Sequence, residues 1–285
     1  MEEVLDAVLD FLHRSKGMDL RGYRRSTLLR RLQIRINRLG LAPQNYPELL
    51  RRDEEESAAL LEAIAINVSN FFRDPMVFEN LAQRVLPELI ERKRRRRRLE
   101  LRIWSAGCAS GEEAYSLAIL LHRALGQELA DWSVHVFATD RSAAALRLAE
   151  KGIYPESRLE EVRFGMLKRY FEPGPGGYRL RDELRRLVCF SEDDLTAGGR
   201  FAPSESLFGG FDLILCRNVL IYFNPELQDH VFSRLLRSLG DGGYLVLGSS
   251  ESPNARVEKS LRVQDSKNRI YQKPPANDVF SWRAP

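Results

Sequence analysis

The chain has 285 residues, of which 44% are hydrophobic and 29% charged, with a formal net charge of +4. This composition is typical of a globular protein and far from that of a disordered chain. No segment approaches the roughly 20 apolar residues of a membrane-spanning helix, and the acidic, amphipathic first residues do not resemble a signal peptide. We therefore expect a cytoplasmic protein with two unequal domains.

Cysteine and histidine are scattered along the sequence. Cys108, Cys189 and Cys216 form no CxxC pair, and the four histidines are equally dispersed. This pattern favours neither a disulfide framework nor a metal site, and it predicts cysteines that act as small buried apolar side chains.

The first 65 or so residues carry apolar side chains at helical spacing, which predicts an all-helical domain. Residues 14–38 contain nine arginines and lysines against one acid, Asp19. On a helix that ends at Gly40, one face carries the apolar residues Leu29, Leu32, Ile36 and Leu39. An adjacent stripe carries arginines, which indicates an acidic partner: Arg24, Arg31, Arg35 and Arg38. Another helix is expected at about 48–64.

A connecting helix is expected to begin at Pro75, with Asp74 as its N-cap. It ends in the uninterrupted basic run 92–98. Such a run can bind nucleic acid or a membrane, but a solvated helix end is the more common meaning. We interpret it as a domain edge.

From Leu99 onward, short apolar segments alternate with helical ones. Strands are expected at 101–106, 133–139, 187–190, 211–216 and 242–248, and helices at 112–125, 142–151 and 225–239. Such alternation predicts a Rossmann-like doubly wound α/β domain. The glycine- and proline-rich stretch 170–182 indicates a small inserted β-subdomain, and the tail from Pro274 should be loosely ordered.

Ligands of such sheets bind at the carboxyl ends of the strands. The first strand is followed by SAGCASGEEAYS, in which Gly107 and Gly111 allow a close backbone approach. Asp140 follows the second strand, where an acid can accept hydrogen bonds from both hydroxyls of a ribose. These features predict a nucleoside ligand, and the missing GxGxxG spacing counts against a dinucleotide.

Two further polar segments lie beside predicted strands and helices. FDLILCRNVLIYF places Arg217, Asn218 and Tyr222 beyond the central strand, and INVSNFFRDP places Asn67, Ser69 and Arg73 before the connecting helix. Polar residues directly after a fully apolar strand are poor candidates for the core, so we expect the first group to serve function.

Seven segments of the chain occur in a fixed order: NVSNFFRDP, WSAGCASGEEAYSLAILL, FATDRS, KGIYPES, LKRYF, ILCRNVLIYF and GSSES. The same segments occur in the same order in chemotaxis-receptor glutamate methyltransferases. The chain closely resembles this CheR family up to about Lys273. The resemblance implies methyl transfer from S-adenosylmethionine to receptor glutamates, giving methyl esters and S-adenosylhomocysteine. It also implies binding to the cytoplasmic helical stalk of a chemoreceptor. Nothing in the sequence demands more than a monomer, and we expect neither nucleic-acid binding nor membrane insertion.

The implied organisation is a receptor-recognition domain at 1–72, a connecting helix and basic linker at 73–98, a methyltransferase domain at 99–273 and a tail at 274–285. The implied cofactor contacts are Asn67, Ser69, Arg73, Gly107, Glu113, Asp140, Asp194, Leu195, Arg217 and Asn218. Within this set, Glu113 and Asp140 would hold the methionyl amine and the ribose, and Asp194 would contact the adenine. Arg73 and Tyr222 would act at the reacting centre.

Two departures from the family modify this expectation. The family often has asparagine at the position of Asp194, and the inserted segment 172–181 is short compared with members that bind a tethering receptor peptide. We therefore expect direct recognition of the receptor stalk through the arginine stripe.

The alternatives are a nucleic-acid methyltransferase, suggested by the basic run and a pI near 9.0, and a non-catalytic cofactor-binding signalling module. The chain lacks the Asp/Asn-Pro-Pro-aromatic motif of many base methyltransferases.

Overall fold

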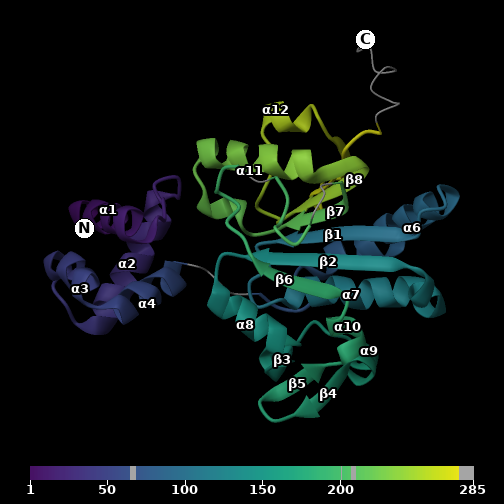
Figure 1. The fold of residues 1–285 in the computed structure, drawn as a ribbon, viewed down its shortest axis with the longest axis horizontal. Coiled ribbons are helices and arrows are strands. Elements are labelled where there is room, and N and C mark those ends of the chain that lie inside the picture. The colour runs from purple at the N-terminus through teal and green to yellow at the C-terminus, as the bar shows by residue number, and fades with distance from the viewer. Residues whose placement is uncertain (65–68, 200, 207–209, 276–285) are drawn as a thin grey trace. The chain divides into compact units, whose positions relative to one another are not determined.

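The computed structural model describes residues 1–64, 69–199, 201–206 and 210–275 (Figure 1). Asn67 and nearly all of the tail therefore lie outside the described residues. The chain forms two compact units, Met1–Ile66 with Leu220–His230, and Asn67–Val219 with Val231–Pro285. This division differs from the expected one, because 69–72 group with the larger unit and 220–230 join the smaller one.

The smaller unit is helical, as predicted. Its helices are α1 (Glu2–Lys16), α2 (Arg25–Leu39), α3 (Tyr46–Arg52) and α4 (Glu54–Ile64), with short 3-10 turns η1 (Pro43–Asn45) and η5 (Leu220–Tyr222) and the beginning of α11 (Pro225–Ser238). The apolar residues of α1 through α4 pack into one hydrophobic core. No described helix of the protein is both long and apolar enough to cross a membrane.

The predicted apolar face of α2 is partly wrong. The helix buries Leu28, Leu32 and Ile36, whereas Leu39 is 38% exposed. The three buried residues are spaced four apart and form a single packing ridge. Leu39 occupies the last turn before Gly40, where the helix ends.

The single helix expected at about 48–64 is two helices. Asp53 separates α3 from α4, and its side chain accepts a hydrogen bond from the Glu56 amide at 3.0 Å, as an N-cap does. Glu56 is buried and binds both Arg35 of α2 and the hydroxyl of Tyr46. Arg35 lowers the pKa of Glu56, so this carboxylate remains ionised inside the unit.

The larger unit is an α/β domain, which confirms the predicted fold class. Its connecting and first helices are α5 (Pro75–Asn80), a π turn η2 (Leu81–Val85), α6 (Leu86–Arg95) and α7 (Glu112–Leu125). The remaining helical elements are η3 (Gly126–Asp131), α8 (Ala143–Lys151), η4 (Glu156–Arg158), α9 (Phe164–Tyr170), α10 (Asp182–Arg185), the rest of α11, and α12 (Ala255–Glu258).

A seven-stranded sheet forms the centre of this unit, in the order β6-β2-β1-β7-β8-β10-β9 (Figure 1). The strands are β1 (Glu100–Ala106), β2 (Ser133–Asp140), β6 (Val188–Glu192), β7 (Phe211–Cys216), β8 (Leu239–Leu247), β9 (Arg262–Asp265) and β10 (Ile270–Gln272). The first five in spatial order pair in parallel, and the last two are antiparallel. Every residue of β7 is buried, which explains its uninterrupted apolar sequence.

The strand order reverses between β1 and β7. From β1 the chain continues to β2 on one side, while β7 pairs with the other side of β1, with Ser105 opposite Leu215. Such a switch point leaves a crevice at the carboxyl ends of the two strands. The predicted small inserted subdomain is confirmed as a three-stranded sheet of β3 (Ile153–Tyr154), β5 (Gly177–Leu180) and β4 (Phe171–Gly174).

The basic run at the end of α6 is in large part structural. Lys93 forms a 2.8 Å ion pair with the buried Asp212 of β7. Arg92 donates to the carbonyl of Gly242, and Arg94 pairs with Glu128 at 2.7 Å. These contacts tie α6 to the sheet, so the run is more than the solvated helix end that we expected.

Candidate cofactor site

The turn after β1 lies at the switch point. Gly107 has a φ of 78°, and its amide donates to the carbonyl of Thr139 at 2.8 Å. A Cβ on Gly107 would lie 2.4 Å from a methyl carbon of Val219, just beyond β7. The glycine is therefore required both for its left-handed backbone and for packing between two strand ends, not only for a ligand's approach.

A buried arginine connects three of the predicted loops. The side chain of Arg217 is 1% exposed and pairs with Glu113 at 3.1 Å and with Asp74 at 2.6 Å. It also donates to the carbonyl of Arg73 at 2.9 Å and covers the ring of Phe78. Three residues predicted from the sequence, Arg73, Glu113 and Arg217, are thus brought together. Asp74 occupies the N-cap position of α5, as predicted, but its carboxylate binds Arg217 and makes no capping hydrogen bond.

The charges of this cluster favour a cationic ligand. Glu113 has a second partner, the Ser105 hydroxyl, which donates to it at 2.8 Å. One guanidinium between two carboxylates leaves one negative charge in excess. Glu113 is largely buried while Asp74 is 39% exposed, so this excess charge is only partly shielded by water and attracts a positively charged group.

The segment 69–74 is anchored on both sides. The carbonyl of Ser69 accepts from Arg158, whose own carbonyl accepts from the Phe71 amide at 3.1 Å. The Phe71 ring lies edge-on against Tyr154, with 4.8 Å between the ring centres. The Phe72 amide donates to Ser116 of α7 at 3.0 Å. These contacts fix the backbone before the exposed Arg73, and the ion pair of Asp74 with Arg217 holds the residue after it.

Asp140 ends β2 and holds two loops. Its two carboxylate oxygens accept from the amides of Ala109, at 2.8 Å, and Ser142, at 2.9 Å. Burial raises the pKa of Asp140. Each carboxylate oxygen accepts more than one hydrogen bond, so the group retains capacity for ligand hydroxyls.

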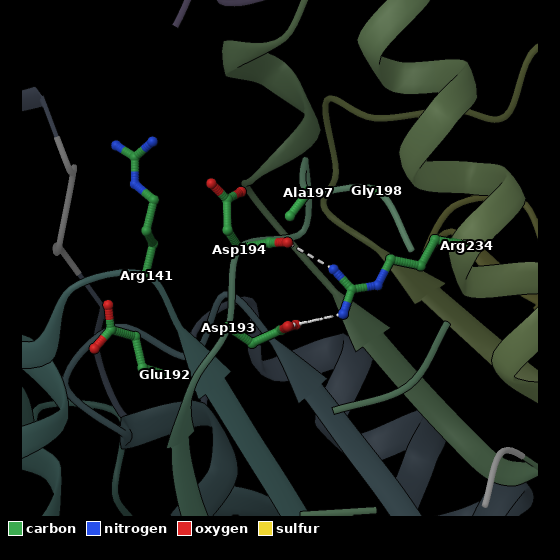
Figure 2. Close-up of a pocket in the computed structure, with 7 residues that line it drawn as sticks. All are labelled: Arg141, Glu192, Asp193, Asp194, Ala197, Gly198 and Arg234. Atoms are coloured by element: carbon green, nitrogen blue, oxygen red, sulfur yellow. Dashed lines mark hydrogen bonds and ion pairs between the residues drawn. The ribbon is translucent and has the colours of Figure 1, made fainter. Parts of the chain in front are cut away.

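A cavity of about 400 Å³ opens beyond the carboxyl ends of β2 and β6 (Figure 2). It is lined by Arg141, Glu192, Asp193, Asp194, Ala197, Gly198 and Arg234. Asp193 receives two hydrogen bonds of 2.8 Å from Arg234, which also donates to the carbonyl of Asp194 at 2.7 Å. Arg234 therefore fixes the wall of the cavity. Leu195, also predicted here, is buried.

The residues that follow β7 belong to both units: Asn218 is part of the larger unit, and Tyr222 is part of the smaller one. Asn218 has a φ of 60°, and its amide donates to Glu251 at 2.9 Å. Glu251 is buried and also accepts from the Gly248 amide at 2.7 Å. Tyr222 belongs to the smaller unit, so the structure does not place it in the same compact unit as Arg73.

The sequence interpretation missed several residues of this site. The sequence predicts Asp74 only as a helix N-cap, and it predicts no role for Ser105, Glu251 or Arg234. Arg234 alone carried a usable signal, because it stands among apolar residues of α11 as a charged residue on a buried face.

Comparison with known proteins identifies the two parts of the chain. The model described as "CheR methyltransferase, SAM binding domain" matches residues 67–270, and "CheR methyltransferase, all-alpha domain" matches residues 3–65. The chain belongs to the CheR methyltransferase family. This confirms the resemblance seen in the sequence.

Named relatives agree with this assignment. A chemotaxis protein methyltransferase of Vibrio parahaemolyticus is 33% identical over 270 residues, covering 92% of this chain and 94% of the relative. Chemotaxis protein methyltransferase 1 of Pseudomonas aeruginosa is 35% identical over 272 residues, with the same coverages. An uncharacterized 104.1 kDa protein of Rhodobacter capsulatus is 34% identical across 99% of this chain, which spans only 29% of that protein.

S-adenosylmethionine is therefore the cofactor of this CheR chain, and the residues present fit it. Glu113 would offer its carboxylate to the ammonium group of the cofactor, and Asp140 would offer its carboxylate to the ribose hydroxyls. The buried Nε of Arg217 has no hydrogen-bond partner among the described residues, so it offers a donor to a carboxylate. The cavity volume lies within the roughly 300–1,000 Å³ that is usual for small-molecule pockets.

Replacing Asp140 should weaken cofactor binding and remove a pH dependence. We expect Asp140→Asn to raise the Kd for S-adenosylmethionine about tenfold or more, since hydrogen bonds to a charged acceptor are lost. In the wild type, affinity should fall from neutral toward acidic pH, because burial raises the pKa of Asp140 and protonation removes the acceptor. Calorimetric titration across this range tests both effects; an unchanged Kd, or an equal pH slope in the variant, would contradict the role.

Removing the Asp74 carboxylate should loosen the Arg73 segment. We expect Asp74→Ala to lower kcat about tenfold or more, because small misplacements of a reacting group are costly. The free energy of unfolding should fall by only about 1–2 kcal/mol, since Asp74 is 39% exposed. Methyl-transfer kinetics and thermal unfolding measure these effects. The exposed neighbour Met76, changed to Ala, is the control, and equal kcat values for the two variants would refute the prediction.

Proposed function

We propose that this CheR protein transfers the methyl group of S-adenosylmethionine to glutamate side chains of a chemoreceptor, giving glutamate methyl esters and S-adenosylhomocysteine. The observation that carries the proposal is the Arg217 cluster, which fixes the Arg73 segment beside the cofactor-binding turn. The relatives are named chemotaxis protein methyltransferases, which supports a chemoreceptor as the substrate. We further propose that residues 1–72 serve receptor recognition and 99–273 serve catalysis.

The proposed reaction needs no general base. The bound cofactor supplies a methyl group activated by a positively charged sulfur. A glutamate carboxylate, with an ordinary pKa near 4.3, is already ionised at neutral pH. One carboxylate oxygen would form the new O–C bond with the methyl carbon as the C–S bond breaks, and the electron pair of the C–S bond would remain on sulfur. The work of the protein is then alignment and exclusion of water.

We propose that Arg73 and Tyr222 orient the acceptor carboxylate. The Arg73 carbonyl is held by Arg217, and the residue is exposed, so an incoming anion can reach a guanidinium whose backbone is fixed. A charge-assisted hydrogen bond from Arg73 and a hydroxyl donor from Tyr222 would set its direction. The arginine contact has to stay moderate, because strong stabilisation of the anion would raise the barrier.

Recognition of the receptor is proposed to use the arginine stripe of α2. Of its four members, Arg35 is bound to Glu56, and the Arg24 Nε donates to the carbonyl of Phe223 at 3.1 Å. Arg38 is exposed and Arg31 partly exposed. These two residues lie seven positions apart, two turns along one helix face. They are therefore the members best placed to attract an acidic helical surface.

The structure also bears on the nucleic-acid alternative. The main support for a nucleic-acid methyltransferase is the basic run at 92–98, but Arg92, Lys93 and Arg94 contact other residues of the larger unit. A charge already paired within the fold contributes less to a nucleic-acid surface. No described feature of the site favours a base as acceptor over a carboxylate.

The decisive experiment is transfer of labelled methyl from S-adenosylmethionine to receptor-rich membranes, followed by mild alkali. We expect label on a receptor band that alkali releases, because carboxyl methyl esters hydrolyse readily. Arg73→Ala and Tyr222→Phe should each incorporate label far more slowly. Alkali-stable label, label on added nucleic acid instead of protein, or full activity of both variants would refute the corresponding part of the proposal.

Reversing the exposed charges of α2 should weaken receptor binding. We expect the double variant Arg31→Glu/Arg38→Glu to raise the KM for receptor about tenfold or more, with kcat unchanged, and to reduce the salt dependence of KM. A matched control, Arg14→Glu/Arg51→Glu, makes the same charge change on α1 and α3. Equal effects of the two double variants would show that net charge matters and the α2 face does not.

A further inference from the structure

A short backbone pairing unites the two stretches of chain that form the smaller unit. Tyr23 lies opposite Phe223 in an antiparallel bridge. The Arg24 amide donates to the carbonyl of Tyr222 at 2.8 Å, and the Asn224 amide donates to the carbonyl of Gly22 at 2.8 Å. We call these six residues, 22–24 and 222–224, the joint.

Side chains reinforce the joint. The rings of Tyr23 and Phe223 meet edge to face, with 4.9 Å between their centres, and Phe223 is 3% exposed. This geometry is favourable for aromatic rings beyond the area that they bury. The two stretches also approach closely, because a Cβ on Gly22 would lie 2.7 Å from a methyl carbon of Leu227. The Tyr23 amide donates to the carbonyl of Leu20, a residue of the helical core.

Tyr222 lies inside the joint, and α2 begins next to it, at Arg25. The smaller unit therefore carries both the proposed arginine face and the tyrosine proposed to orient the acceptor. The proposed cofactor contacts that the structure describes, from Ser69 to Asn218, belong to the larger unit.

We infer that Tyr23 is a positioning residue for methyl transfer: through Phe223 it fixes Tyr222 within the compact unit that also carries the arginine face of α2. This inference rests on the proposed function. It assigns no contact between Tyr23 and the substrate.

Removing the Tyr23 ring should lower kcat without affecting the cofactor. We expect Tyr23→Ala to reduce kcat for receptor esterification about tenfold or more, because orientation of the acceptor is lost. The Kd for S-adenosylmethionine and the KM for receptor should stay within about twofold of wild type, since their proposed contacts are untouched. Phe11→Ala is the control, because Phe11 is a partly buried ring packed on the same helical core.

A reversible cross-link tests the joint independently of the ring. Residues opposite each other in such a pair lie about 4.5 Å apart between Cα atoms, within reach of a disulfide. In a background with the exposed Cys189 changed to Ser, the pair Tyr23→Cys/Phe223→Cys should show low kcat when reduced. Oxidation should restore kcat at least about fivefold, because the disulfide replaces the ring contact.

The outcomes separate this inference from the proposed function. If wild-type protein forms no receptor ester, the proposed function fails. If wild-type protein is active and folded Tyr23→Ala keeps its kcat, or falls no further than Phe11→Ala, the inference fails. Failure of the cysteine pair to form a disulfide, or equal kcat in both redox states, also overturns it.

Discussion

The buried Arg217 guanidinium is the interaction on which the cofactor site depends. It follows the central strand β7 and binds carboxylates from two other segments, Asp74 before α5 and Glu113 on α7. A guanidinium with its rigid fork of donors can hold such partners in one plane, which an ammonium group cannot. Three loops that are distant in sequence are thereby fixed at the switch point of the sheet.

The parallel pairing of the strands explains why several acidic residues lie at one edge of the domain. Glu113, Asp140 and Asp194 follow different strands, yet parallel pairing brings their strand ends to the same edge. Backbone amides satisfy Asp140, an arginine satisfies Glu113, and Thr196 satisfies Asp194. Because each carboxylate is held by the fold before any ligand arrives, little reorganisation is needed on binding.

Much of the larger unit could be predicted from the sequence, because apolar strands and amphipathic helices alternate with clear periods. The five strands and three helices expected between residues 101 and 248 begin and end within about three residues of their expected bounds. The pairing of Arg217 with Asp74 could not be predicted, because it depends on β7 lying beside β1. The hydrophobic periodicity of a segment predicts a strand but does not determine the order of strands in the sheet. Asp74 has the residue type and position of a helix cap, and only its left-handed backbone turns the carboxylate elsewhere.

The helical unit was harder to interpret for a related reason. Leu28 and Leu39 are both compatible with an apolar face of α2, and tertiary packing selects Leu28. The union of residues 220–230 with the first 66 residues has no local signal at all. It arises from backbone pairing between segments about two hundred residues apart, whose side chains alone resemble ordinary loop residues.

The discontinuity of the helical unit has a consequence for how the protein can be divided. The chain passes between the two units three times, after residues 66, 219 and 230. A fragment beginning at Asn67 would lack the strand partner of Phe223 and would expose an aromatic ring that is now buried. A fragment ending at Ile66 would lose residues 220–230, which complete its own unit. We therefore expect neither fragment to keep its packing when the chain is divided at residue 66, although the linear sequence suggests a clean boundary there.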